Sequence, residues 1–268
     1  MTVEARLCRV SGLPPGRVIT SYESVGDARP LWLSDAPATA ELWSRLRRQH
    51  PVTGLWPLLL EALDPLDEDF RPWGCGELYP QGTSSSVDHR AETLLADWWR
   101  EYTSVDEDDD HLTAEERLAV TAPFGRAWPG LSPTSAPDTD PEEMAEEYAK
   151  VFLAGHPHAR LGLVEALRGA DALTAVGWSG PANYGDTAKF SAIVRSWEDR
   201  FGARVVAVGF DTLHLSVAAP PRRQEDALPV AAEHFAFCPD TVWQGAHDGL
   251  ASCAETLVGL NCWEFWWD

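Results

Sequence analysis

The chain has 268 residues, of which 44% are hydrophobic and 13 are tryptophan, so it has enough apolar material for a large core. Its 42 acidic residues outnumber its 21 lysines and arginines, and the net charge of −21 argues against proteins that bind nucleic-acid phosphates or anionic membranes through clustered cations. We therefore expect a globular protein with neither a nucleic-acid partner nor a membrane partner.

Cysteine usage and apolar runs bear on location. The five cysteines form no Cys-x-x-Cys pair and show no zinc-like spacing, so we expect them to be reduced and the protein to be cytoplasmic. Residues 1–17 lack the apolar segment of a signal peptide, and the longest apolar stretch, residues 55–60, is far too short to span a bilayer. We expect no cofactor.

The first part of the chain predicts a small α/β region over residues 1–128. Apolar runs at residues 31–33 and 55–60 indicate strands, and residues 38–49 between them predict a helix with Leu42, Trp43 and Leu46 on its inner face. Apolar residues from Val87 to Tyr102 recur at helical spacing and predict a second amphipathic helix.

Two polar segments interrupt this pattern. The acidic run at residues 106–110 follows the second helix, and residues 129–141 have the proline-rich, polar composition of a solvated linker. We place a domain boundary at residues 129–141, which leaves residues 142–268 as a second domain.

The second domain opens with a helix that starts at Pro141 and ends near Gly155, because Glu142 and Glu143 suit the first turn of a helix. Residues 160–168 are predicted to form a further helix. Residues 172–178 are predicted to form a buried strand.

The rest of the second domain shows clearer periodicity. Apolar residues from Phe190 to Phe201 predict a helix that Gly202 ends, and residues 205–208 and 213–217 predict a hairpin. Helices are predicted at residues 224–237 and 246–258. These elements favour an α+β fold, with a βαββαβ-like antiparallel sheet covered by helices.

The last residues predict a buried strand. Trp263, Phe265 and Trp267 alternate onto one face, and Cys262, Glu264 and Trp266 lie on the other. Such a density of aromatic rings indicates core packing.

Four segments together resemble the bacterial domain-of-unknown-function family numbered 4253. They are Val-Gly-Trp-Ser-Gly-Pro-Ala-Asn-Tyr-Gly-Asp-Thr at residues 176–187, His-Phe-Ala-Phe-Cys-Pro-Asp at 234–240, Gln-Gly at 244–245 and Trp-Trp-Asp at 266–268. The resemblance covers roughly residues 160–268. It implies a domain boundary and a bacterial origin, and it transfers no catalytic residue.

The loop at residues 179–187 is the first candidate site, because it precedes a helix N-terminus whose first amides could bind an anion. Ser179, Asn183 and Tyr184 offer hydrogen-bonding groups for a ligand. The favoured alternative is a capped turn, since the carboxylate of Asp186 would satisfy those amides itself.

Asp211 and His214 are the second candidate. On a strand, His214 points away from Leu213 and Leu215, so it faces solvent or a cleft and could work with Asp211 as a general acid–base pair. The favoured alternative is a satisfied structural pair. His156 and His158 lack further ligands at metal-binding spacing, and we predict no metal site.

The third candidate combines Asp240 and Gln244 with the neighbouring Cys238. We favour a turn over a reactive thiolate here, because no base stands beside Cys238 in the sequence. We further hypothesise that Asp240 and Gln244 gather with Asn183, Tyr184 and Asp268 at one end of the sheet. Such a cluster would create a pocket that no single motif reveals.

These observations leave two classes of function. The favoured one is a cytosolic protein-interaction or binding module without catalysis, whose aromatic surface and acidic segments bind a protein partner. The alternative is a small-molecule-binding protein or hydrolase-type enzyme that uses residues 179–187, Asp211 and His214. A deep pocket containing those residues would favour the alternative, whereas a flat patch of exposed tryptophans would favour an interaction module.

Overall fold

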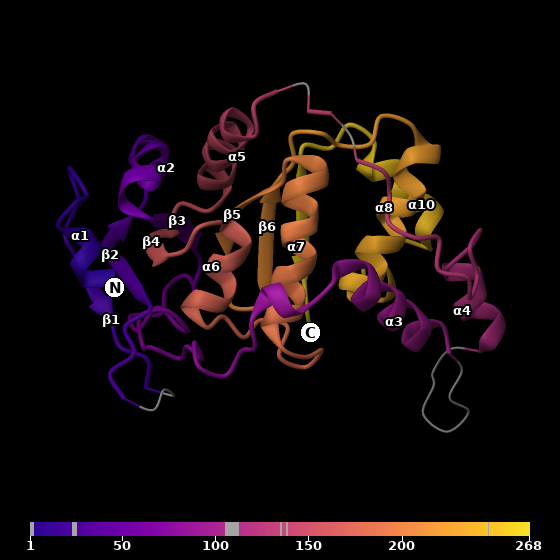
Figure 1. Cartoon of the computed structure of the whole chain (residues 1–268), viewed down its shortest axis with the longest axis horizontal. Helices are drawn as coiled ribbons and strands as arrows, with labels where there is room; N and C mark the ends of the chain where they lie inside the picture. Colours follow the sequence, from indigo (N-terminus) through magenta and orange to yellow (C-terminus); the bar gives the residue numbers. More distant parts are fainter. Residues whose placement is uncertain (1–2, 23–25, 105–112, 135, 138, 246) are drawn as a thin grey trace.

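The computed structural model describes residues 3–22, 26–104, 113–134, 136–137, 139–245 and 247–268. The acidic run at residues 106–110 lies outside them. A seven-stranded sheet in the order β1-β2-β4-β3-β5-β6-β7 runs through the molecule (Figure 1). Adjacent strands in the sheet are antiparallel, except for the parallel pair β3 and β5. The strands are β1 (Gly16–Ile19), β2 (Leu31–Pro37), β3 (Leu55–Leu60), β4 (Arg160–Glu165), β5 (Arg204–Val208), β6 (Thr212–Ser216) and β7 (Cys262–Trp266).

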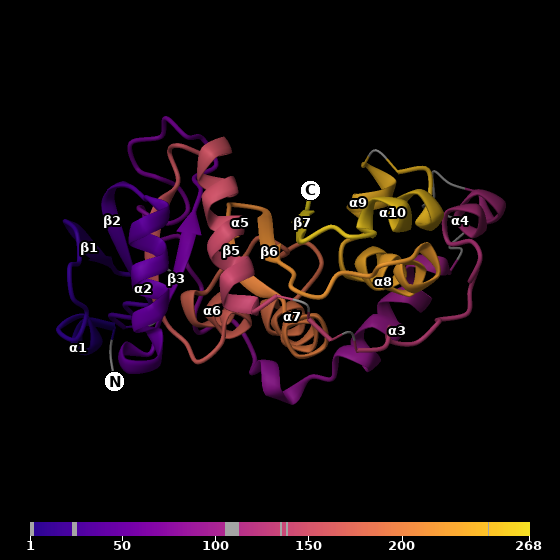
Figure 2. The same cartoon turned by 90° about the horizontal axis from the view of Figure 1, so that it is seen from above.

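Helices cover both faces of this sheet, which confirms the predicted α+β class. α2 and α5 run side by side on one face, and α6 and α7 cover the other (Figure 2). α3, α4, α8, α9 and α10 gather at the end of the molecule away from β1 (Figures 1 and 2). The helices are α1 (Val3–Leu7), α2 (Ala40–Thr53), a short 3-10 turn (Ser86–Asp88), α3 (Ala91–Thr103), α4 (Ala114–Val120), α5 (Pro141–Gly155), α6 (Gly169–Val176), α7 (Thr187–Phe201), α8 (Gln224–Phe237), α9 (Asp240–Trp243) and α10 (Leu250–Leu257).

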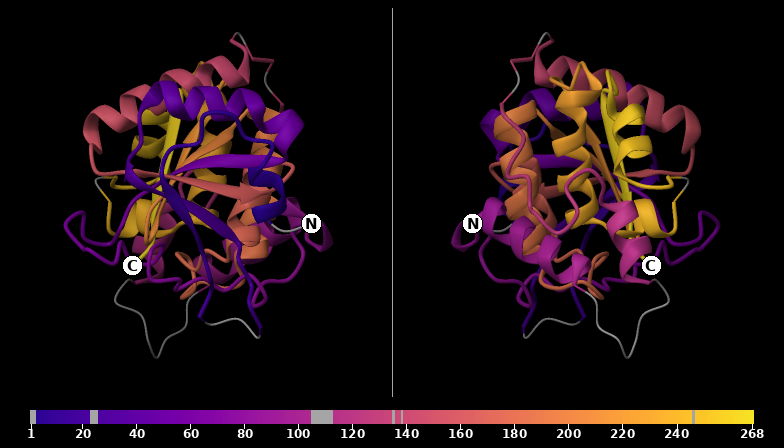
Figure 3. Two further views of the ribbon diagram at one scale, coloured as in Figure 1. Left: turned by 90° about the vertical axis from the view of Figure 1, so that its left-hand side faces the viewer. Right: turned by 90° about the vertical axis from the view of Figure 1, so that its right-hand side faces the viewer.

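Side-chain alternation along the strands divides the core into two clusters. Leu58 and Leu60 of β3 pack beneath α6 and α7, whereas Leu55 and Leu59 pack beneath α2 and α5. Both faces are buried, so β3 is apolar along its length. The end views show the strands rotating steadily along the sheet, as sheet twist requires (Figure 3).

The sheet mixes strands from both sides of residues 129–141. β4, which follows that segment, pairs with β2 and β3, which precede it. The parts of the chain before and after the predicted boundary therefore share one sheet, and a division into domains at residues 129–141 stays a prediction.

Two predicted elements were wrong. Residues 160–168 were expected to be helical, but they contain β4, whose Leu161, Leu163 and Val164 are buried between β2 and β3. Residues 172–178 were expected to be a strand, but they belong largely to α6, which ends at Gly177 with φ 74°. Short apolar runs do not show a period that separates helix from strand.

The later elements match their predictions closely. α7 begins at the N-cap Asp186 and ends at Gly202, whose φ of 61° is the left-handed conformation that glycine adopts without strain. β5 and β6 form the predicted antiparallel hairpin.

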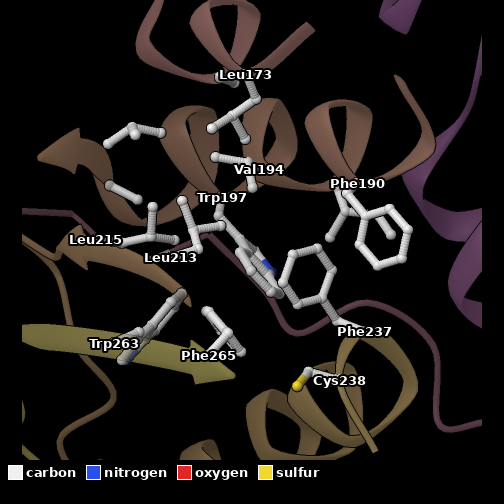
Figure 4. Packing of buried hydrophobic residues seen from close by; sticks show 14 of the residues in the cluster. Leu173, Phe190, Val194, Trp197, Leu213, Leu215, Phe237, Cys238, Trp263 and Phe265 are labelled. Carbon is white, nitrogen blue, oxygen red and sulfur yellow. The ribbon is translucent and has the colours of Figure 1, made fainter. Parts of the chain in front are cut away.

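The terminal strand is also confirmed. Trp263, Phe265 and Trp267 are each at most 2% exposed, and Trp266 on the opposite face is 40% exposed. Phe265 stacks on Trp197 of α7 with ring centroids 5.3 Å apart (Figure 4). β7 therefore completes an aromatic core between the sheet, α7 and α8.

The longest helices among the described residues have 15 residues, and none combines the length and the apolar character that a bilayer crossing requires.

Candidate functional site

The predicted loop at residues 179–187 borders a pocket of about 490 Å³. One wall is this loop with Trp178 before it, the opposite wall comes from residues 77–83, and Phe210 adds an aromatic side chain. A volume of this size lies within the range of small-molecule sites, roughly 300–1,000 Å³. The described lining is Glu77, Tyr79, Gly82, Thr83, Trp178, Ser179, Gly180, Ala182, Asn183, Gly185, Asp186, Thr187 and Phe210.

Trp178 anchors the loop. Its indole N–H donates to the carbonyl oxygens of Gly209 at 2.9 Å and Phe210 at 3.2 Å, so the loop is tied to the β5–β6 turn. Gly180 lies flat on this ring, and a Cβ there would come 2.2 Å from Cζ2 of Trp178. Glycine at position 180 is thus required by the close packing of backbone on indole.

Asp186 closes the loop as a helix cap. Its carboxylate accepts from the backbone N–H of Ala188 at 2.9 Å and of Ser84 at 3.0 Å, which joins the two walls of the pocket. Burial raises the pKa of Asp186, but hydrogen bonds from Ser84 and Ala188 outweigh it and leave the pKa below its usual value. The carboxylate occupies the helix N-terminus, as the capped-turn interpretation predicted.

Arg71 braces the opposite wall. Its guanidinium donates twice to Glu77, at 2.5 and 3.0 Å, and lies 5.1 Å from the ring centroid of Phe210. Ser179 also lines the pocket, and no group in the described part of the chain forms a hydrogen bond with its hydroxyl. Ser179 is therefore available to a ligand.

The hypothesis that distant polar groups gather at the end of the sheet is confirmed. Asp240 is 3% exposed, and its carboxylate accepts from Tyr184 Oη at 2.6 Å and Gln244 Nε2 at 3.1 Å. The backbone N–H of Asp268 donates to the same carboxylate at 3.2 Å, and Asn183 Nδ2 donates to the carbonyl of Asp268 at 3.0 Å.

These groups hydrogen-bond to one another, and a pocket formed by all of them stays a prediction. Burial, followed by the hydrogen bond to Asp240, raises the pKa of Tyr184 above its usual value, so the phenol stays protonated. Asn183 also lines the neighbouring loop pocket. The cluster thus holds the loop against β7, and ligand binding by Tyr184, Asp240 and Gln244 stays a prediction.

His214 lies beneath α5 and is 2% exposed, so it faces a covered surface rather than solvent. Its Nδ1 is 3.3 Å from Tyr148 Oη, and its Nε2 is 3.9 Å from a carboxylate oxygen of Glu61. Burial, with a smaller effect from His156, lowers the pKa of His214 to about 4. His214 is therefore neutral at pH 7.

Asp211 and His214 were candidates for a pair, but the structure gives each of them other partners. The carboxylate of Asp211 accepts from Trp266 Nε1 at 3.2 Å. Next to His214, Glu61 Oε1 lies 2.5 Å from His156 Nδ1, and the two histidine ring centroids are 5.9 Å apart. Sequence reasoning missed Glu61, Tyr148 and His156 as neighbours, because Glu61 follows β3, the other two belong to α5 and its C-cap, and no local motif connects these segments with His214.

Cys238 has no reactive environment. Burial raises the pKa of its thiol to about 12, and Sγ donates to the carbonyl of Trp266 at 2.9 Å. Within the described ranges, no group of three or more histidines, cysteines or carboxylates has the spacing to hold a metal ion.

No curated protein and no solved structure matches the chain. One family model does match, and it covers the loop at residues 179–187, the Asp240 cluster and His214, but not the pocket wall at residues 77–83. Residues 160–268 match the model of the family described as "Domain of unknown function (DUF4253)".

Proposed function

We propose that this protein binds a small molecule in the pocket between the loop at residues 178–187 and the segment at residues 77–83. The observation that carries the proposal is the pocket itself, which contains the predicted residues Ser179, Asn183 and Asp186. Its two walls are joined by the hydrogen bond from Ser84 to Asp186, so the binding surface is largely preformed.

The lining indicates the class of ligand. Trp178 and Phe210 supply aromatic surface, and Glu77 and Asp186 are the acidic side chains. Carboxylates in the walls of a chain with net charge −21 disfavour an anionic ligand. We infer a neutral or cationic molecule with an aromatic or apolar part, to which the Ser179 hydroxyl hydrogen-bonds.

The placement of tryptophan supports ligand binding over a tryptophan-based protein interface. All 13 tryptophans are described, and Trp266, at 40%, is the exposed one among them, whereas the others are buried or half-buried. A flat aromatic patch was the feature expected of an interaction module, and a single exposed ring does not make one.

The cellular setting is part of the proposal. Cys8 and Cys75 are free and exposed, which suits a reducing compartment. We infer the cytoplasm of a bacterium.

A thermal-shift screen of neutral and cationic metabolites tests the proposal. A ligand should raise the melting temperature of the wild type, and Ser179→Phe should abolish that shift because the new ring fills the pocket. Thr256→Phe, at an exposed position of α10, is the matched control and should keep the shift. Retention of the shift in Ser179→Phe would place the ligand elsewhere and reject the proposed pocket.

A further inference from the structure

A second pocket, of about 460 Å³, lies at the other end of β5, between α2, the start of α5 and the end of α7. β5 begins at Arg204 in this pocket, whereas Phe210, just beyond its far end, lines the loop pocket. α2 and α5 border it on the face where they run side by side (Figure 2). The two pockets therefore lie at opposite ends of β5 and share no lining residue.

Arginine is concentrated in this pocket. The chain holds half as many basic as acidic residues, yet four arginines line this one site. Three of them are held within its walls, because the side chains of Arg47, Arg168 and Arg204 are 10%, 30% and 23% exposed. The described lining is Arg47, Arg48, His50, Pro51, Trp56, Glu142, Glu146, Leu167, Arg168, Glu198, Asp199 and Arg204.

Trp56 positions the most deeply buried guanidinium. Its indole N–H donates to the carbonyl of Val205 at 3.1 Å, which fixes the ring, and the guanidinium carbon of Arg47 lies 3.9 Å from the ring centroid. The Trp56 ring therefore holds the guanidinium of Arg47 on one face, and Arg47 Nη2 lies 2.8 Å from a carboxylate oxygen of Glu142.

Glu142 occupies the space between two guanidiniums. Its carboxylate accepts from Arg47 Nη2 at 2.8 Å and from Arg204 Nε at 2.8 Å. The side chain of Glu142 is 41% exposed, so this carboxylate can leave for solvent without disrupting a core contact. Without it, four arginines in the pocket would face only three carboxylates, those of Glu146, Glu198 and Asp199.

We propose that this pocket binds a small phosphate- or carboxylate-bearing molecule between Arg47 and Arg204, and that the carboxylate of Glu142 is its built-in competitor. Paired guanidiniums match the geometry of an oxyanion, and a phosphate carries more charge than the carboxylate it displaces. The ligand would thus replace Glu142 on donors that are already in position.

Titration calorimetry with inorganic phosphate and pyrophosphate, at constant ionic strength, tests the proposal. Glu142→Gln should tighten binding by roughly tenfold, because it removes the competing charged acceptor, and Arg204→Gln should weaken binding by about as much. A purely structural ion-pair cluster predicts no binding in any of these proteins.

Glu146→Gln is the matched control, since it removes one negative charge from the same pocket but leaves Arg47 and Arg204 untouched. It should change the affinity by about twofold at most, through long-range charge alone.

An equal gain in Glu142→Gln and Glu146→Gln would overturn the competitor role. Absence of phosphate and pyrophosphate binding in both the wild type and Glu142→Gln would overturn the site. If Glu142→Gln does not fold, Arg204→Gln still tests the site. Loss of phosphate binding in Arg204→Gln would support the site, and unchanged phosphate binding would reject it. Ser179→Phe should leave phosphate binding unchanged, which separates this outcome from that of the loop pocket.

Discussion

At the scale of single residues, burial decides the charge of two histidines. His214 and His234 are 2% and 3% exposed, and burial lowers their pKa values to about 4 and about 3. Both rings are therefore neutral in the folded protein at pH 7. An unfolded histidine has a pKa of about 6.5, so the unfolded chain takes up protons first as the pH falls.

This difference predicts acid sensitivity. As the pH falls from about 6.5 towards 4, each of these histidines should remove on the order of 2–3 kcal/mol from the free energy of unfolding. Urea unfolding at pH 7 and at pH 4.5 checks this, with His214→Gln as the variant that no longer titrates. The variant should lose less stability than the wild type over this interval, and an identical loss would contradict the assignment.

Two neighbouring tryptophans allow a matched test of packing. Trp267 is 2% exposed and packs edge-on against Trp178, Phe190 and Phe237, whereas Trp266 is 40% exposed. Trp267→Ala should cost about 3–5 kcal/mol of unfolding free energy, and Trp266→Ala should cost under about 1 kcal/mol. Chemical denaturation of both variants measures this, and equal costs would show that Trp267 is not a core residue.

At the scale of elements, one buried ion pair joins α7, α8 and the segment before α5. Glu233 is fully buried, and it accepts from Arg200 Nη1 at 2.8 Å and from Trp197 Nε1 at 2.7 Å. The backbone N–H of Ser132 donates to it at 2.7 Å. A single carboxylate thus connects both helices to the segment that composition marked as a linker.

Removal of this carboxylate should be costly. Glu233→Ala leaves the Arg200 charge and two donors without a partner, so we expect a loss of about 3–5 kcal/mol in unfolding free energy. Asp226→Ala is the control, because its ion pair with Arg223 is exposed and such pairs contribute at most about 1 kcal/mol. Similar melting temperatures for the two variants would contradict this account.

The elements also show how far sequence patterns reach. α7 was predictable because its large apolar residues recur at helical spacing from Phe190 to Phe201, and β7 was predictable because its buried aromatic residues alternate with more exposed ones. β4 was not predictable because both of its faces are buried, and α6 was not because its eight residues are too few to show a helical period clearly. For the sites, the Asp240 cluster was a hypothesis about polar residues gathering at one end of the sheet. No local motif connects His214 with its neighbours, because Tyr148 lies in α5, His156 caps α5 and Glu61 follows β3.

At the scale of the whole molecule, the residues that match the family model are not the same as those that form the sheet. Residues 160–268 match the family model, yet β4 at the start of that region has both of its neighbours, β2 and β3, outside it. The loop pocket likewise needs residues 77–83 for its second wall. The matched region therefore depends on the preceding residues for both its sheet and its pocket.

This dependence predicts the behaviour of a fragment. Residues 160–268 alone would leave β4 without hydrogen-bonding neighbours and would expose its apolar side chains, so the fragment should not fold cooperatively. Circular dichroism during urea unfolding checks this against the full chain. A sharp transition in the fragment would instead support an independent domain and the predicted boundary at residues 129–141.

The proposed function requires the loop pocket to bind a ligand between two walls that come from distant parts of the chain. Amide chemical-shift mapping by NMR, during titration with a molecule found in the thermal-shift screen, tests it most directly. We predict shifts at Ser179 and Asn183 on one wall together with Glu77 and Thr83 on the other. Shifts confined to one wall, or to residues outside this pocket, would contradict the claim.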